Sequence, residues 1–361
     1  MTSDAARVAV AGFLLGGHVR REKSMRSIQS AELSSLRGVC LTKVWWKICS
    51  LVAAVGFVLC LVPRDVWACA CGCSVFDVGT PSLIPNGSGG TVWLEYDFMN
   101  QYINWHATQP SSRANNDDKQ IKTNFLTAGA QYMFNRDWGA MVTVPYTIRT
   151  FRTQGDGANI NQYNHANFGD VRIWGMYTGL LEDMSLGLLA GFKLPTGDHT
   201  YNDFDRDTSI GSGSTDLLLG AYKIGEIPRK LGNIPLTFRE RPFNWYLQAQ
   251  YEYPFMTTGN YTPGKEFNGA LGVFYNFGQV GPLKELAPLL SLYGSVRTHD
   301  LGNEANTPNS GYDRLLIAPG GEIRLGIFRL YTDFEFPLYQ YVDGNQLTAP
   351  FLTKTILSYD F

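Results

Sequence analysis

Apolar and polar residues alternate one by one through most of the C-terminal three quarters of the chain. At the C-terminus, Leu357, Tyr359 and Phe361 are apolar or aromatic, and a polar residue lies between each pair. Alternation with a period of two is typical of a β-strand that has one apolar and one polar face. Segments of this kind recur about twelve times, so the sequence predicts an all-β fold.

The links between these segments alternate in length. The links at residues 100–123 and 195–214 are long, those at residues 135–137 and 180–183 are tight, and the long link at residues 225–242 breaks the rule. Long extracellular loops and short periplasmic turns alternate in outer-membrane barrels. Closure also leaves no unpaired backbone group facing lipid. We therefore predict a closed antiparallel transmembrane β-barrel of about 12 strands; a secreted β-sandwich is the alternative.

The N-terminal part of the chain has a different pattern. Its apolar run at residues 48–62 follows Lys43 and Lys47 and is shorter than the roughly 20 residues that a membrane-spanning helix needs. Small residues follow the run at positions that a signal peptidase reads. We predict a signal peptide with an N-terminal extension at residues 1–68, a Cys-rich periplasmic segment at residues 69–90 and the barrel at residues 91–361.

Composition and charge narrow the range of partners. The chain is 44% hydrophobic, 13% aromatic and 17% charged, with a formal net charge of −2. This is too polar for a helical membrane protein, and no basic face for nucleic acid is evident. The expected location is the bacterial outer membrane. The expected partners are outer-membrane lipid, a small-molecule solute and the barrel-assembly machinery, which would bind the strand that ends at Phe361.

The same alternation assigns charged residues to the lumen. Acids and bases are mixed there, so they either set up a transverse field across a narrow pore or pair with one another as a structural filling. A barrel of about twelve strands has a narrow interior. The predicted lumen and constriction residues are Asp170, Arg172, Lys193, Asp216, Glu252, Arg314 and Glu335.

Cys69, Cys71 and Cys73 form the most specific local motif. Thiolates at every second position can bind a soft metal ion, but a fourth ligand for a closed zinc site is missing. A disulfide between two of the cysteines, with the third free or lipidated, is the alternative. We expect no cofactor elsewhere in the chain.

Asp203, Asp205 and Asp207 place carboxylates at every second position of a long link. Such a run can wrap Ca²⁺, although the glycine and the closing glutamate of an EF-hand loop are missing. A solvated surface loop is the competing interpretation. No G-x-S-x-G motif and no readable Ser/His/Asp spacing is present, so we predict that the protein is not an enzyme.

Two glycine-rich runs support a family resemblance. The run GFKLPTGD at residues 191–198, followed by GSGSTD at residues 211–216, resembles a strand and loop signature of the outer-membrane barrel family named after the MetA pathway of phenol degradation. FGDV at residues 168–171 resembles the preceding strand. The VFDVGT run at residues 75–80, after the cysteines, is similar to a branch that begins with Cys-Gly-Cys. The resemblance implies transporters or channels for small, often hydrophobic molecules.

These observations predict an outer-membrane channel that passes a small solute by passive diffusion. One alternative is a metal-binding or redox-associated membrane anchor that acts through Cys69, Cys71 and Cys73. The other is an outer-membrane hydrolase whose site is assembled from separate strands. Whether the residues before the first strand plug the pore is left open by the sequence.

Overall fold

The computed structural model describes Phe76 and residues 78–85, 87–154, 159–231, 234–235, 237–238 and 241–361. The predicted signal peptide and the three clustered cysteines Cys69, Cys71 and Cys73 lie outside the described residues. In the part of the chain that the structure describes, no helix is long and apolar enough to cross a membrane.

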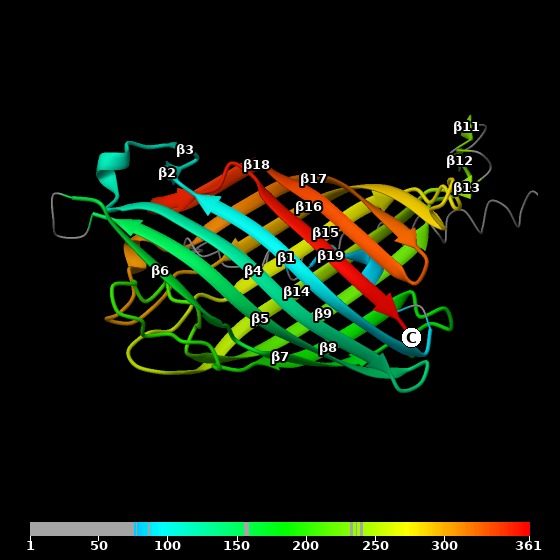
Figure 1. Ribbon diagram of the computed structural model, residues 1–361, viewed down its shortest axis with the longest axis horizontal. Coiled ribbons are helices and arrows are strands. Elements are labelled where there is room, and N and C mark those ends of the chain that lie inside the picture. Colours follow the sequence, from blue (N-terminus) through cyan, green and yellow to red (C-terminus); the bar gives the residue numbers. More distant parts are fainter. Residues whose placement is uncertain are drawn as a thin grey trace, which may run out of the picture. The chain divides into compact units, whose positions relative to one another are not determined.

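Twelve antiparallel strands close into a barrel, as the alternation predicts (Figure 1). They are β1 (Gly89–Gln101), β4 (Asp118–Met133), β5 (Trp138–Thr153), β7 (Arg172–Tyr177), β8 (Leu186–Lys193), β9 (Ser214–Glu226), β14 (Asn244–Thr257), β15 (Glu266–Phe274), β16 (Glu285–Arg297), β17 (Tyr312–Leu325), β18 (Phe328–Thr348) and β19 (Leu352–Asp360). Each strand pairs with its neighbours in the chain. The ring closes where β1 pairs with β19, from Thr91 opposite Asp360 to Met99 opposite Leu352.

The C-terminal residue is part of this closure. Phe361 and Gly90 exchange two backbone hydrogen bonds, each 2.9 Å long. The terminal strand is therefore paired to its last residue, and no edge remains open at the seam.

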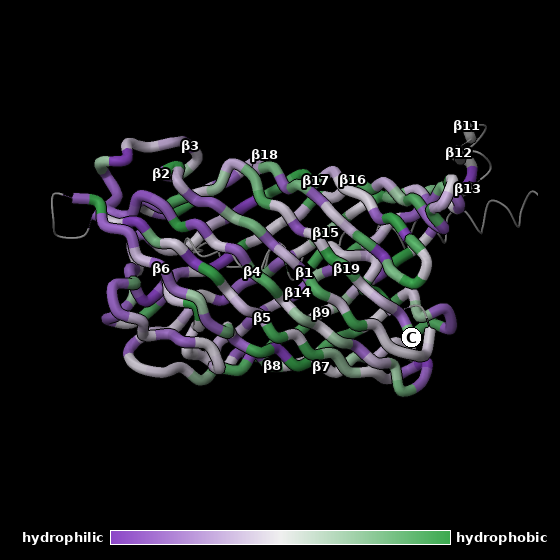
Figure 2. Tube along the Cα trace, in the orientation of Figure 1, coloured by the Kyte–Doolittle hydropathy of each residue, from purple (hydrophilic) through white to green (hydrophobic). Residues whose placement is uncertain are grey.

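The outer face of the barrel is apolar and the inner face is polar, as alternation requires. On β1, the side chains of Val92, Leu94 and Tyr96 are exposed, whereas Glu95 and Asp97 are buried inside. Figure 2 shows hydrophobic and hydrophilic positions interleaved along the strands. An exposed apolar face on every strand is unfavourable in water and favourable in lipid, so this face is the membrane-contacting surface.

Replacing Leu94 with arginine will lower the free energy of unfolding from a bilayer by about 2–4 kcal/mol, because the charge would enter lipid. Leu94 is 53% exposed and lies near the middle of β1. The measurement is the urea midpoint of the protein refolded in phosphatidylcholine vesicles. Gln109→Arg, at an exposed position of β3 (Gln109–Pro110), is the control and should change the stability by less than about 0.5 kcal/mol. Equal effects of the two substitutions would mean that Leu94 does not face lipid.

The strands extend further at the loop end than the sequence predicts. The link at residues 100–123 was expected to be a loop, but it contains β2 (Ile103–Ala107), β3 and the start of β4. β6 (Asn161–Phe168) pairs with β5 beyond the end of β7. β6 and the start of β4 carry polar residues on both faces, and β2 is only five residues long. They lie beyond the lipid, where no apolar face is needed, so hydrophobic alternation does not reveal them.

The long link at residues 225–242 adds no strand to the barrel. It contains two separate two-residue ladders, β10 (Lys230–Leu231) with β11 (Ile234–Pro235) and β12 (Thr237–Phe238) with β13 (Arg241–Pro242). The barrel order passes directly from β9 to β14, and the strand count stays at twelve.

Candidate functional site

A segment that precedes the first strand lies inside the barrel. We call Phe76 and residues 78–85 the lumenal segment; it includes a short 3₁₀ turn at Pro81–Leu83. Phe76 packs in a buried cluster with lumenal side chains of the strands, and its ring lies 5.9 Å from that of Phe125. The sequence predicts a periplasmic segment at residues 69–90 and leaves open whether it plugs the pore; its described residues pack among lumenal side chains.

Three tyrosine hydroxyls converge on one carbonyl oxygen of the lumenal segment. Tyr246, Tyr293 and Tyr331 place their hydroxyl oxygens 3.0, 3.1 and 3.2 Å from the oxygen of Gly79. Tyr293 and Tyr331 also lie within hydrogen-bond distance of Asp333, at 2.8 and 2.7 Å. Because each phenol has one proton, these two tyrosines share their donors between Gly79 and Asp333.

Other lumenal side chains bind the backbone on either side of Gly79. The Gly79 N–H donates to the side-chain oxygen of Gln248 at 2.9 Å. The Lys354 ammonium donates to the Val78 carbonyl at 2.8 Å, and the Gln131 amide donates to the Leu83 carbonyl at 2.9 Å. A segment without a partner strand thus has its backbone polar groups satisfied by side chains from the wall.

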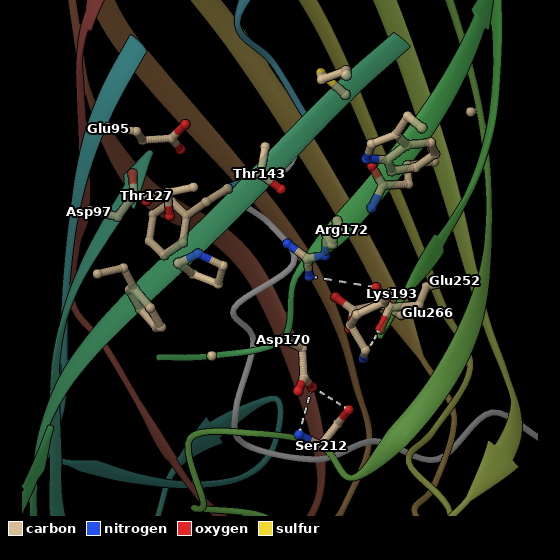
Figure 3. Close-up of a pocket in the computed structure, with 18 of the residues that line it drawn as sticks. Glu95, Asp97, Thr127, Thr143, Asp170, Arg172, Lys193, Ser212, Glu252 and Glu266 are labelled. Atoms are coloured by element: carbon tan, nitrogen blue, oxygen red, sulfur yellow. Dashed lines mark hydrogen bonds and ion pairs between the residues drawn. The ribbon is translucent and has the colours of Figure 1, made fainter. Parts of the chain in front are cut away.

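A cavity of about 250 Å³ remains in the lumen beside this segment. It is lined by residues of β1, β4, β5, β7, β8, β9, β14, β15 and β16. Residues 206–212 of the long link after β8 also contribute, as does the lumenal segment. Figure 3 shows Glu95 and Asp97 on one side of the cavity and Arg172, Lys193 and Glu252 on the other. A cavity lined by a few convergent polar groups is a candidate binding site.

One side of the cavity holds a network of paired charges. Lys193, 6% exposed, forms ion pairs with Asp216 and with Glu252, the latter at 2.5 Å. Arg172 lies 3.7 Å from the second oxygen of Glu252. Lys193 stands directly opposite both Asp216 and Arg172 in the strand registers, so neighbouring strands bring these groups together. Two cations and two carboxylates balance one another there.

Asp170 extends this network toward the loop end. Its carboxylate accepts hydrogen bonds from the backbone N–H groups of Gly197 at 2.9 Å and Ser212 at 2.8 Å, and from the Ser212 hydroxyl at 2.5 Å. Gly211 lies against Gly197, where a Cβ on either residue would overlap the other's backbone. We call the long link at residues 195–214 the glycine-rich link; the Asp170 carboxylate holds it folded over the cavity.

The structure thus brings five of the seven predicted lumen residues together. The other two, Arg314 on β17 and Glu335 on β18, do not line this cavity. The Arg314 guanidinium stacks 3.7 Å from the centre of the Tyr312 ring, and Glu335 is fully buried. Alternation shows whether a side chain points into the lumen but not which part of the barrel wall carries it. It therefore cannot separate Arg314 and Glu335 from the other five residues.

The facing side of the cavity is acidic. Glu95 and Asp97 project from β1 (Figure 3). They stand opposite Thr127 and Phe125 of β4 in the strand register. Their period-two spacing placed both in the lumen, but no sequence signal distinguished them from the other lumenal acids.

The acidic run at residues 203–207 lies in the link that covers the cavity. Asp203 is exposed and has a φ of 66°. Partial burial and the nearby charge of Asp117 raise the pKa of Asp205. Within the described ranges, no three or more His, Cys, Asp or Glu side chains are grouped as a metal site. A calcium site at Asp203, Asp205 and Asp207 stays a prediction.

A closed barrel with an apolar outer belt and a polar lumen defines the class of outer-membrane β-barrels. The structure is similar to that of an outer-membrane channel from Pseudomonas putida F1, with a TM-score of 0.56 and 13% identity, over 79% of this chain and 100% of that one.

Two further solved structures give weaker matches. The β-domain of the Bordetella autotransporter BrkA has a TM-score of 0.44 and 13% identity, over 76% of this chain and 100% of that one. The Pseudomonas putida toluene transporter TodX has a TM-score of 0.37 and 10% identity, over 82% and 95%. The sequence matches no family model and no curated protein. The resemblance to the phenol-degradation family therefore stays a prediction.

Proposed function

We propose that this barrel is an outer-membrane channel that passes a small solute by passive diffusion. The observation that carries the proposal is the cavity of about 250 Å³ between the lumenal segment and the glycine-rich link. A barrel that served only as an anchor would have no need for an open, charged space inside. The cavity gives a solute room inside the lumen.

The chemistry of the cavity suits passage with weak binding. Its basic groups are mostly paired with carboxylates of the protein, so a solute meets mixed, partly neutralised charges. Contacts of this kind favour entry without holding the solute tightly, as conduction requires. The lumenal segment narrows the path and restricts it to small solutes.

Planar-bilayer conductance of the refolded chain from residue 69 onward tests the proposal. The comparison is a chain that also lacks residues 69–88, and so lacks the lumenal segment. We expect small, steady openings in the longer chain and a conductance several times larger in the shorter one, because the lumen widens. Heat-shifted migration in detergent gels controls for folding of both barrels. If neither folded protein shows channel openings, the result would contradict a channel and favour an anchor or an enzyme.

A further inference from the structure

The acidic side of the cavity has a carboxylate oxygen that lacks a partner. Asp97 is 2% exposed and lines the cavity. Its Oδ1 has no hydrogen-bond partner among the described residues. A second acceptor that lines the same cavity, the side-chain oxygen of Gln131, also has none. Buried acceptors of this kind are costly unless a donor reaches them.

The basic groups near Asp97 are engaged elsewhere. Lys354 stands directly opposite Asp97 in the register of β1 and β19, but its ammonium donates to the Val78 carbonyl of the lumenal segment. Across the cavity, Lys193 is paired with Asp216 and Glu252. Asp97 forms no ion pair with any residue that the structure describes. This oxygen is therefore open to a donor that enters the cavity.

Aromatic residues beside Asp97 indicate what kind of donor fits. Phe125 stands opposite Asp97 on β4, and Phe76 packs against Phe125. A carboxylate beside aromatic faces favours an organic ammonium ion, which gains a charge-assisted hydrogen bond and a cation–π contact. The absence of a grouped metal-ligand set among the described residues argues against a metal ion.

We propose that the cavity binds a small organic ammonium ion, with its N–H donors directed to Asp97 and its apolar part against Phe125. The proposal rests on the proposed channel function, because it names the class of solute that the cavity selects. The volume of about 250 Å³ admits a single ring with a short ammonium arm.

Calorimetric titration of the refolded full barrel with benzylammonium tests this inference. Benzyl alcohol and benzoate have nearly the same shape and serve as neutral and anionic comparison probes. We expect benzylammonium to bind at least about tenfold more tightly than either, the ratio that corresponds to one charge-assisted hydrogen bond. Sodium chloride at equal concentration should not displace it. Equal binding of the three probes, or displacement by sodium at the same concentration, would overturn the proposal.

Asp97→Asn removes the charge and keeps the shape. It should weaken benzylammonium binding at least about tenfold and leave benzyl alcohol binding unchanged. Glu322→Gln is the matched control, since Glu322 lines a second cavity, together with Pro81 and Ser82 of the lumenal segment; it should leave both affinities unchanged. Wild-type affinity in folded Asp97→Asn would overturn the inference. If that variant does not fold, the probe comparison on the unaltered protein still decides.

The two proposals fail in different measurements. Conductance without preference for benzylammonium would leave the channel standing and remove the ammonium site. Selective binding of benzylammonium in a barrel that conducts no ions would keep the site and remove the channel.

Discussion

The substitution Gly79→Val will release the lumenal segment and raise the conductance to that of the chain lacking residues 69–88. Gly79 has a φ of +89°, which side chains other than glycine rarely adopt, and an added Cβ would lie 1.8 Å from the Tyr293 ring. Backbone strain costs about 1–3 kcal/mol and overpacking about the same again. Together these two costs exceed the stabilisation that the shared hydrogen bonds of the three tyrosines provide. Single-channel conductance and protease access to the segment measure the release.

Gly87→Val is the matched control for this experiment. Gly87 lies on the same stretch of chain, and a Cβ added there would meet no atom within 4 Å. Its conductance should equal that of the unaltered protein. Larger openings in both variants would mean that valine acts through the barrel and not through the segment. Unchanged conductance in Gly79→Val would mean that the segment does not limit the pore.

The alternation of apolar and polar residues predicts the barrel well, because contact with lipid on one face of each strand imposes this alternation. On β1, lipid selects apolar residues at Val92, Leu94 and Tyr96, and the lumen selects polar ones between them. Where the strands leave the lipid, as at the start of β4 and the end of β18, that selection ends. The expected loop at residues 100–123 is therefore partly strand.

The filling of the lumen is harder to predict, because its contacts join residues far apart in the chain. The Gly79 carbonyl meets tyrosines 167, 214 and 252 positions away. The available signal was the presence of large tyrosines on lumenal faces of β14, β16 and β18, where a narrow barrel needs something to pack against them. The Lys193 network is easier to predict, since most of its members lie on adjacent strands within or beside the runs at residues 168–171, 191–198 and 211–216.

Lys193→Met will lower the free energy of unfolding by about 3–5 kcal/mol, the usual cost of removing one partner from a buried ion pair. Methionine fills nearly the same volume, so packing changes little, but Asp216 and Glu252 lose their shared cation. Asp216 is completely buried and Glu252 is 7% exposed, so water replaces the ammonium only poorly. The urea midpoint in lipid vesicles measures the loss. Lys284→Met, at an exposed turn, should cost less than about 0.5 kcal/mol.

Adding Asp216→Asn to Lys193→Met should restore more than half of the lost stability. The double variant removes the cation and one carboxylate together, and Glu252 keeps Arg172 at 3.7 Å as a counterion. Coupled neighbours of this kind depart from additivity by about 0.5–3 kcal/mol, whereas independent sites add. If the two losses simply add, the pair is not coupled, and the network is a set of separate contacts without a common charge balance. Recovery in the double variant would show that charge balance, more than packing, fixes Lys193 between its two carboxylates.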